Sequence, residues 1–494
     1  MIEQFLYASP MATVVLGALV LMLLANSTLT LSRLNLIAVS FLGLSLILQF
    51  SLYGDKSTAF LFETIFGDTF ILDDFASIFD MMFTAGAMLT LLINNDYFKS
   101  HTYFSGEYFA LMLFSLFGMM MLSHAHELLT AFIALEIASL SVYALVGYHK
   151  SNKVSSEAMM KYIVLGSMTG AFFMLGTALI YGSVGSTSLT EIANYVNGNS
   201  LDNIPMLIIG ATFIMLTILF KIGAVPFHSW VVDVYHGAPY PITMYMASTF
   251  KIAVFAIALR LYLVDFAPIN SFWTELLQAV TILTLFGGSW LAINQSLVKR
   301  MLAGSSIVHS GYLLIALSSI GLGSKVAAPA IMFYLIAYFI SAAGAFGILS
   351  FIDSQSKRQM KYEDFKGFAQ RRPYMALMMS IFMLSLAGFP STIGFLGKFY
   401  IFTSAIESGQ ILLAGLGILT AFISVYYYFK LIAMMYFYPS EEEQKVFPVN
   451  ISTILIVMMA LIVVWGGIGT TLIPYIPGAD GFMEIAIEAM SSLR

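Results

Sequence analysis

Long apolar runs separated by short polar stretches fill most of the chain. A helix needs about 20 mostly apolar residues to cross a bilayer, and runs of about this length recur from one end to the other. They predict about fourteen membrane-spanning helices. The expected spans are 10–25, 34–50, 72–93, 108–123, 128–147, 162–182, 204–222, 240–262, 276–294, 301–322, 326–351, 374–405, 409–437 and 450–474. The predicted fold class is therefore all-α, a polytopic membrane protein.

The composition excludes several classes of protein. Of the 494 residues, 59% are hydrophobic and only 10% are charged, whereas a soluble globular protein carries roughly 25% charged residues. A soluble enzyme and a disordered protein are excluded, and so is a nucleic-acid binder, because no basic tract is long enough to follow a phosphate backbone. The chain contains no cysteine, which excludes disulfides, thiolate-ligated iron–sulfur clusters and cysteine zinc sites.

The distribution of lysine and arginine predicts the orientation in the membrane. Basic residues favour cytoplasmic loops, and with an outer N-terminus the loops after odd-numbered spans hold thirteen of the twenty-two basic residues. These are Arg33, Lys99, Lys150, Lys153, Lys299, Arg300, Lys357, Arg358, Lys361, Lys366, Arg371, Arg372 and Lys445. The opposite side holds Lys56, Lys325 and Arg494, with Arg260 near its edge, and the acidic Asp55, Glu63, Asp68, Glu191 and Asp202. We expect both termini on the outer side of a bacterial inner membrane.

We single out five of the charged residues within or at the ends of expected spans, where each charge costs at least about 2.5–3.5 kcal/mol. They are Glu136, Lys161, Lys221, Lys251 and Lys398. For Glu136 and Lys251, which lie mid-span, the simpler alternative is a static buried ion pair. Lys161 is close to a helix start, and Glu157 precedes it by four residues, so a snorkelling surface pair remains an alternative there.

Two of these lysines adjoin predicted helix breaks. Lys221 begins the segment KIGAVPFHSW, and Lys398 ends the segment SLAGFPSTIGFLGK. The break residues are Gly223 and Pro226 in the first segment and Gly388 and Pro390 in the second. Proline lacks an N–H and clashes with the preceding helical turn. Broken backbone at membrane depth must be buried in protein or line a wet cavity, and paired breaks in corresponding halves indicate a transport site.

The two breaks recur with a period of five spans. The broken helix is fourth among spans four to eight and again among spans nine to thirteen. Because five is odd, the second set must lie inverted relative to the first. We therefore predict three helices in residues 1–105, a five-helix repeat in 106–265, a second, inverted repeat in 266–440 and a last helix in 441–494.

Other polar residues offer weaker candidates. His228 and His309 lie beside a break and within a span, and an unperturbed pKa near ~6.5 suits histidine as a proton relay. A neutral histidine bonded to Ser229 or Ser310 is the equal alternative. The string HAHE at 124–127 has no further metal ligands nearby in the sequence, and Asp73, Asp74 and Asp80 are interpreted as an interfacial start of the third span.

The charged and broken segments resemble those of the antiporter-like membrane subunits of respiratory NADH:quinone oxidoreductase (complex I), over nearly the whole chain. The matching strings are ALEIASLSVYALVGY, SSEAMMKYIVLGS, FKIGAVPFHSWVVDVYHGAPYPITMYMASTFKIAVF, NQSLVKRMLAGSSIVHSGYLLIAL and LAGFPSTIGFLGKFY. Lys398 resembles the N and L members of this family, because M members carry glutamate there. The string DVYHGAP is most similar to N members. The first hundred residues depart most from the family pattern.

The resemblance implies that Glu136, Lys221, Lys251 and Lys398 belong to a proton path, with Glu157 and Lys161 in support. It implies a subunit without a redox centre, cofactor site or metal site, which moves protons when quinone is reduced elsewhere. NADH or another donor, FMN, iron–sulfur clusters and quinone are then expected in other subunits. The implied partners are adjacent antiporter-like and small membrane subunits, the lateral helix of subunit L and the lipid bilayer, with no nucleic acid.

Elementary electrostatics makes such a path feasible. Burial disfavours a lysine ammonium, whereas a carboxylate at ~5 Å favours it by about 3.3 kcal/mol at an effective dielectric of ~20. Moving one charge across 100 mV costs about 2.3 kcal/mol, which is comparable. We expect that pairing Glu136 with Lys221 holds a proton and that separating them releases it.

Three alternatives remain open at the level of sequence. The first is a subunit of a multisubunit Na+/H+ antiporter or of a membrane-bound hydrogenase. The second is a free-standing transporter for an organic solute, which should show convergent polar side chains at the breaks rather than mainly lysines and apolar residues. The third is a structural spacer with inert buried ion pairs.

Overall fold

The computed structural model describes residues 6–54, 64–66, 69–199, 204–356, 360–440, 450–468 and 478–493. Nine of the loop charges used above to predict the orientation lie outside these ranges: Asp55, Lys56, Glu63, Asp68, Asp202, Lys357, Arg358, Lys445 and Arg494. Helices dominate the described chain, so the predicted all-α class is confirmed. The two strands that the described residues contain, β1 (Thr64–Ile65) and β2 (Phe70–Ile71), pair antiparallel with Thr64 opposite Ile71.

The first half of the chain is built of long helices joined by short turns. Its helices are α2 (Ser9–Leu24), α3 (Leu31–Gly54), α4 (Asp74–Ile93), α5 (Asn95–Ser100), α6 (Glu107–Ser123), α7 (Leu128–Val146), α8 (Lys153–Val184), α9 (Leu189–Gly198), α10 (Pro205–Ile222) and α11 (Ser229–Gly237). The next span is continuous and contains two π-helical segments. It consists of α12 (Tyr240–Tyr245), the π-helical η2 (Met246–Phe250), α13 (Lys251–Arg260) and the π-helical η3 (Leu261–Asp265).

The second half is also built mainly of long helices. Its helices are α14 (Asn270–Ile293, preceded by the 3₁₀ turn η4, Ala267–Ile269), α15 (Val298–Ile320), α16 (Ala327–Ser356), the 3₁₀ turn η5 (Tyr362–Phe365), α17 (Phe368–Arg371), α18 (Pro373–Ala387), α19 (Ile393–Glu407), α20 (Ile411–Phe437), α21 (Ile451–Ile468) and α22 (Ala479–Ser491). The last of these, α22, was not predicted, since its thirteen residues mix acidic and apolar positions.

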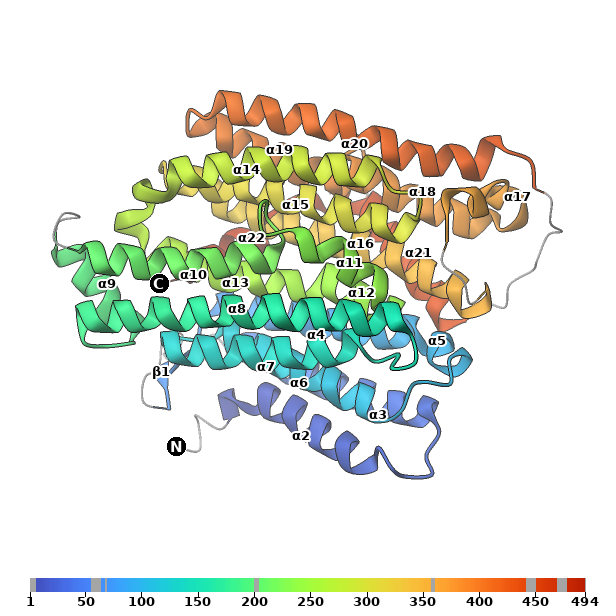
Figure 1. Cartoon of the computed structure of the whole chain (residues 1–494), viewed down its shortest axis with the longest axis horizontal. Coiled ribbons are helices and arrows are strands. Elements are labelled where there is room, and N and C mark those ends of the chain that lie inside the picture. The colour runs from blue at the N-terminus through green and yellow to red at the C-terminus, as the bar shows by residue number, and fades with distance from the viewer. Residues whose placement is uncertain are drawn as a thin grey trace.

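Each predicted span coincides with a helix or a broken helix. Within the described residues, eleven helical stretches are long and apolar enough to cross a membrane, and α2, α6 and α18 are shorter apolar helices. Figure 1 shows the long helices lying side by side along one direction, with α5 and α17 towards one end of the bundle and α9 and β1 towards the other. The two ends therefore correspond to the two expected membrane faces.

The centre of the bundle is formed by three spans that have almost no lipid-facing surface. The apolar windows of α15, α16 and the stretch from Tyr240 to Val264 are completely buried inside the protein. In contrast, α3, α8, α20 and α21 bury less than half of theirs and form the outer surface. A polar side chain on one of the three central spans must therefore find its hydrogen-bond partners within the protein.

Both helix breaks begin at a glycine, and backbone N–H groups at each break form hydrogen bonds. The first lies between α10 and α11, where Gly223 takes a left-handed φ of 74° and the Val225 N–H donates to Thr284 Oγ1 at 3.0 Å. The second lies between α18 and α19, where Gly388 has φ 85° and Pro390 follows two residues later. A left-handed residue at the C-terminal end of a helix is a common stop signal, and glycine adopts it without strain.

Candidate functional site

Three lysines from three different helices reach the buried interior. Lys221 lies in the last turn of α10, Lys251 begins α13 and Lys398 lies in α19, and they are 3%, 4% and 4% exposed. Among the described residues none of the three forms an ion pair with a carboxylate. A buried charge needs close hydrogen-bonding partners to compensate for lost hydration, so the identity of those partners decides what each lysine can do.

Lys221 is held by hydroxyl groups of α7. Its Nζ donates to Ser139 Oγ at 2.6 Å and to the Tyr143 hydroxyl at 3.0 Å. Glu136 occupies the same face of α7, three and seven residues before these two. The carboxylate is half-buried, and its Oε1 has no hydrogen-bond partner within the described chain. Lys221 therefore contacts the face of α7 that carries Glu136, but the two side chains do not form an ion pair.

Lys251 follows directly after the π-helical turn η2 and donates three hydrogen bonds to α15. Its Nζ lies 2.7 Å from the Ser306 carbonyl oxygen, 2.5 Å from Ser306 Oγ and 3.0 Å from Ser310 Oγ. Ser310 in turn donates to the carbonyl oxygen of Ile222 at 2.7 Å. One serine hydroxyl thus joins Lys251 to the C-terminal end of α10, next to Lys221. Isolated π turns are frequent at functional positions of helices.

Lys398 closes the second break. Its Nζ donates to the carbonyl oxygens of Leu386 and Ala387 at 2.8 and 2.9 Å, which are the last carbonyls of α18. It also lies 4.8 Å from the centre of the Tyr312 ring. The C-terminal end of a helix carries a partial negative charge that favours a cation. The Lys398 ammonium is therefore held by the last carbonyl groups of α18 and by the face of the Tyr312 ring, which are all uncharged groups.

His309 occupies the space between the second and third lysines. It is buried on α15, and its two ring nitrogens contact the hydroxyls of Tyr334 at 2.5 Å and Tyr428 at 3.0 Å. Which nitrogen donates depends on the tautomer. His309 also lies within electrostatic range of both Lys251 and Lys398. The expected relay histidine therefore sits between two phenols and two ammonium groups.

The remaining sequence-predicted residues lie apart from this line. Lys161 has a side chain that is 43% exposed and forms ion pairs with Glu157 at 2.7 Å and with Asp233 at 3.0 Å. Asp233 also contacts Arg300 at 3.3 Å. The pairing of Glu157 with Lys161 follows the predicted i,i+4 spacing, and it lies on the surface. His228 is half-buried in the first break and bonds the Pro226 backbone.

Sequence reasoning missed the hydroxyl groups that surround the lysines. They are Ser139, Tyr143, Ser306, Tyr334 and Tyr428, together with Ser310, which the sequence suggested only as a partner of His309 and not of Lys251. A signal for four of them exists in the spacing, because Ser139 and Tyr143 share the face of Glu136, and Ser306 and Ser310 are four residues apart in an apolar span. No such signal links either pair to a lysine about 55–80 positions away.

A second buried charged cluster corrects an expectation. Asp73 caps α4 by accepting from the Ala76 N–H, and it pairs with Arg260 at 2.8 Å in a site that excludes solvent. Asp80 was expected at the interface, but it is buried within α4 and lies 3.1 Å from His124. Burial lowers the pKa of His124, but the Asp80 carboxylate and the hydrogen bonds outweigh it, so the net shift is upward. Within the described residues no group of three or more possible ligands could hold a metal.

The chain is similar in sequence to one family of membrane proteins. The chain matches the family model described as NADH:quinone oxidoreductase/Mrp antiporter, transmembrane, over residues 125–424. It is 42% identical over 379 residues to the NADH-quinone oxidoreductase subunit N of Trichlorobacter lovleyi, covering 76% of this chain and 77% of that protein. Residues 125–424, which the family model matches, include both helix breaks and Lys221, Lys251 and Lys398.

Two solved structures are similar over nearly their full length. A chain of respiratory complex I from Thermus thermophilus with bound aureothin has a TM-score of 0.78 at 28% identity, covering 94% of this chain and 98% of that chain. A chain of an archaeal membrane-bound sulfane sulfur reductase has a TM-score of 0.87 at 25% identity, covering 99% of this chain and 97% of that chain. The helical arrangement is thus shared by more than one kind of respiratory complex.

Proposed function

The chain belongs to the NADH:quinone oxidoreductase/Mrp antiporter transmembrane family, and from this membership we propose that it is the N-type membrane-arm subunit of a complex I. In that role it translocates protons while quinone is reduced elsewhere in the assembly. The proton path that we propose runs through Glu136, Lys221, Lys251 and Lys398. Glu157, Lys161, His228 and His309 have supporting roles.

One observation carries the proposal: among the described residues, the ammonium groups of Lys221, Lys251 and Lys398 donate hydrogen bonds only to uncharged oxygen atoms. A lysine paired with a buried carboxylate would leave an unpaired anion behind when it lost its proton, which costs several kcal/mol. A lysine held by serine, tyrosine and backbone carbonyl groups leaves neutral partners behind. The partners of Lys221, Lys251 and Lys398 are all of this second kind.

The groups follow one another in a defined order along the proposed path. Ser310 links Lys251 to the backbone carbonyl of Ile222, the residue that follows Lys221. From Lys251, His309 and its two tyrosine partners fill the interval to Lys398. Glu136 lies at the start of the line, where its approach to Lys221 would hold the proton and its withdrawal would release it. The unpaired arrangement described above is the releasing one.

We further propose that two inverted repeats, 106–265 and 266–440, each supply one half of this path. The first break follows Lys221 and the second precedes Lys398, and each break is the fourth span of its set. In this proposal residues 1–105 and 441–494 do not belong to either repeat. We place the chain in a bacterial inner membrane with both termini outside.

We place the redox chemistry in other subunits. NADH or another donor, FMN, iron–sulfur clusters and quinone belong, in this proposal, to partners, so this chain contributes to a translocating enzyme without a redox centre of its own. The expected neighbours are other antiporter-like and small membrane subunits and the lateral helix of subunit L. The exposed apolar side chains of α20, such as Leu412 and Phe422 at 75% and 72% exposed, suit such neighbours or lipid.

The main competing function is a subunit of a multisubunit Na+/H+ antiporter or membrane-bound hydrogenase. The similarity to the sulfane sulfur reductase favours a wider class of complexes that share this fold. The relative with 42% identity carries the complex I name and supports the narrower proposal. Pumping by the purified complex that needs Na+ and stops in its absence would favour the antiporter alternative.

The proposal is tested by replacing Lys251 in the assembled complex. Lys251→Met removes the ammonium, and Lys251→Arg keeps a cation that does not release its proton near neutral pH. Both variants should lower the number of protons pumped per electron, whereas Lys150→Met, at an exposed loop lysine, should not. Full pumping by both Lys251 variants would overturn the path. If only the Lys251→Arg variant pumped fully, Lys251 would be needed only as a positive charge that stabilises the structure.

A further inference from the structure

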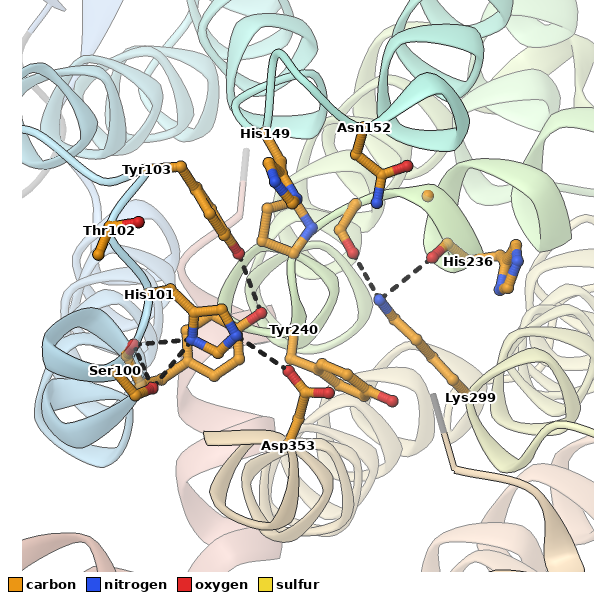
Figure 2. A pocket seen from close by; sticks show the side chains of 14 residues that line it. Ser100, His101, Thr102, Tyr103, His149, Asn152, His236, Tyr240, Lys299 and Asp353 are labelled. Atoms are coloured by element: carbon orange, nitrogen blue, oxygen red, sulfur yellow. Dashed lines mark hydrogen bonds and ion pairs between the residues drawn. The ribbon is translucent and has the colours of Figure 1, made fainter. Parts of the chain in front are cut away.

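A polar pocket outside the lysine line opens at the end of the bundle that carries α5. It encloses about 350 Å³ between α5, the turn from α7 to α8, the turn from α11 to α12, and one end each of α15 and α16. This volume holds roughly a dozen waters at ~30 Å³ each. Figure 2 shows His101, Tyr103, His149, Tyr240, Lys299 and Asp353 converging around it. Basic loop residues, including Lys99 and Lys150, surround this end of the bundle.

Lys299 is a fourth buried lysine, although the sequence placed it in a loop. It lies in the first turn of α15 and is 4% exposed. Its Nζ donates to the Ala238 carbonyl oxygen at 2.5 Å and contacts the His236 carbonyl oxygen at 3.4 Å, and it stands 4.2 Å from the centre of the Tyr240 ring. These carbonyls end α11. Lys299 therefore holds the end of one half-helix, as Lys398 holds the end of α18.

A carboxylate and a histidine face this lysine across the pocket. Asp353 Oδ2 lies 3.5 Å from His101 Nε2, and the carboxylate also shares a hydrogen bond with Tyr97. Tyr240 lies between Asp353 and Lys299 in Figure 2, and the two charges interact electrostatically without touching. His149 stacks on Tyr103 with ring centres 4.0 Å apart at the rim. The pocket thus joins a proton-binding pair to an ammonium held by neutral oxygens.

The pocket is connected with Lys251 through α11 and α15. Tyr235 immediately precedes His236 and shares a hydrogen bond with Ser306, the residue that accepts from Lys251. Lys299 and Ser306 are seven residues apart on α15, which places them on one face about 10.5 Å apart along the axis. A proton at Lys299 is therefore about two helical turns from Ser306, the partner of Lys251, and the Tyr235 side chain lies at the Ser306 end of that interval.

We propose that this pocket is the mouth through which protons are taken up from the side of the basic loops, with the His101–Asp353 pair as the first acceptor and Lys299 as the next. The proposal rests on the function proposed above. A hydronium ion that enters the pocket from bulk water gives its proton to the His101–Asp353 pair and is left behind as a water molecule. The pair passes this proton to the neutral amine of Lys299 and returns to its starting state. Lys299 then gives one proton towards Tyr235 and Ser306.

The first test replaces the two acceptors in the assembled complex. Asp353→Asn and Lys299→Met should each lower the protons pumped per electron by as much as Lys251→Met does, because all three would interrupt one path. Lys299→Arg should keep the end of α11 in place and still lower pumping. Lys153→Met, at an exposed lysine of the same face, is the matched control and should pump normally.

The second test blocks the pocket without removing any charge. The chain has no cysteine, so Thr102→Cys introduces one thiol into this chain, at an exposed pocket residue. A bulky membrane-impermeant maleimide added from the basic-loop side should then lower pumping at least twofold. Lys366→Cys, exposed at the same end, is the control, and the unsubstituted complex reports labelling of other subunits.

The outcomes separate this proposal from the one on which it rests. If Lys251→Met lowers pumping while the labelled Thr102→Cys variant and Lys299→Arg pump fully, the path stands and the uptake pocket is wrong. If Lys251→Met itself pumps fully, the proposed function is wrong. If Asp353→Asn fails to assemble, the labelling result decides, because that variant keeps every charge in place.

Discussion

The hydroxyl of Tyr143 shows how a single atom can control a buried lysine. It accepts one of the two hydrogen bonds of Lys221, and it lies where a Cβ on Gly166 of α8 would stand 2.0 Å away. Glycine at 166 is therefore required for this hydroxyl to reach Lys221. No other residue type could occupy the position without displacing the phenol.

Two variants should disturb this contact by different routes. Tyr143→Phe removes the hydroxyl, and Gly166→Ala should push it away from Lys221. A hydrogen bond to a charged group contributes about 1.5–3 kcal/mol, so either change should weaken the hold on the proton roughly tenfold or more. We expect proton pumping through this subunit to fall several-fold in both, measured as protons per electron in sealed vesicles.

A glycine elsewhere on α8 provides the matched control. A Cβ at Gly182 meets only the terminal methyl of Met206, a flexible side chain that can move. Gly182→Ala should therefore pump normally. Normal pumping by Tyr143→Phe would show that Ser139 alone is enough to hold Lys221 and that Tyr143 contributes only packing.

The membrane spans of this fold were predictable because each is a long apolar run, whereas the short α22 mixes acidic and apolar positions and was not predicted. The breaks were predictable from glycine and proline, whose backbone preferences are local. The contacts across the bundle were not, since Arg260 finds Asp73 at a distance of 187 positions along the chain. The burial of Lys299 was hidden for a similar reason: its carbonyl partners at the end of α11 lie about 60 positions earlier.

The Arg260–Asp73 pair fastens α13 to the start of α4. Arg260 is 1% exposed, contacts Asp73 at 2.8 and 3.0 Å and donates twice to the Ser123 carbonyl oxygen. Arg260 thereby joins three segments: α13, which begins with Lys251, the start of α4 and the C-terminal end of α6. Removing one partner of a buried pair leaves an uncompensated charge, which costs about 3–5 kcal/mol.

This predicts a large but reparable loss of stability. Arg260→Met should strongly reduce assembly and lower the midpoint of thermal unfolding of the purified complex. The double variant Arg260→Met/Asp73→Asn should recover part of the loss, because no buried charge remains and asparagine can still cap α4. Arg300→Met, in a more exposed pair with Asp233, should cost no more than about 1 kcal/mol. Equal losses in the single and double Asp73/Arg260 variants would contradict a charge-based explanation.

At the scale of the whole molecule, the two ends of the bundle differ in charge. The end with α5 and α17 carries Lys99, Lys366 and Arg371, and the end with α9 carries Glu191 (Figure 1). Positively charged loops are retained on the cytoplasmic side during insertion. In the proposed orientation the uptake pocket faces the cytoplasm, so a test of the orientation also tests the proposed direction of pumping.

The absence of cysteine makes that orientation directly measurable. Lys366→Cys and Glu191→Cys each introduce one exposed thiol at opposite ends of the bundle. In intact cells an impermeant maleimide should label Glu191→Cys and leave Lys366→Cys unlabelled, and inside-out vesicles should reverse the pattern. The unsubstituted chain is the blank, since it offers no thiol. The opposite pattern would place the basic loops outside, and the pocket around Lys299 would then lie on the side where protons are released.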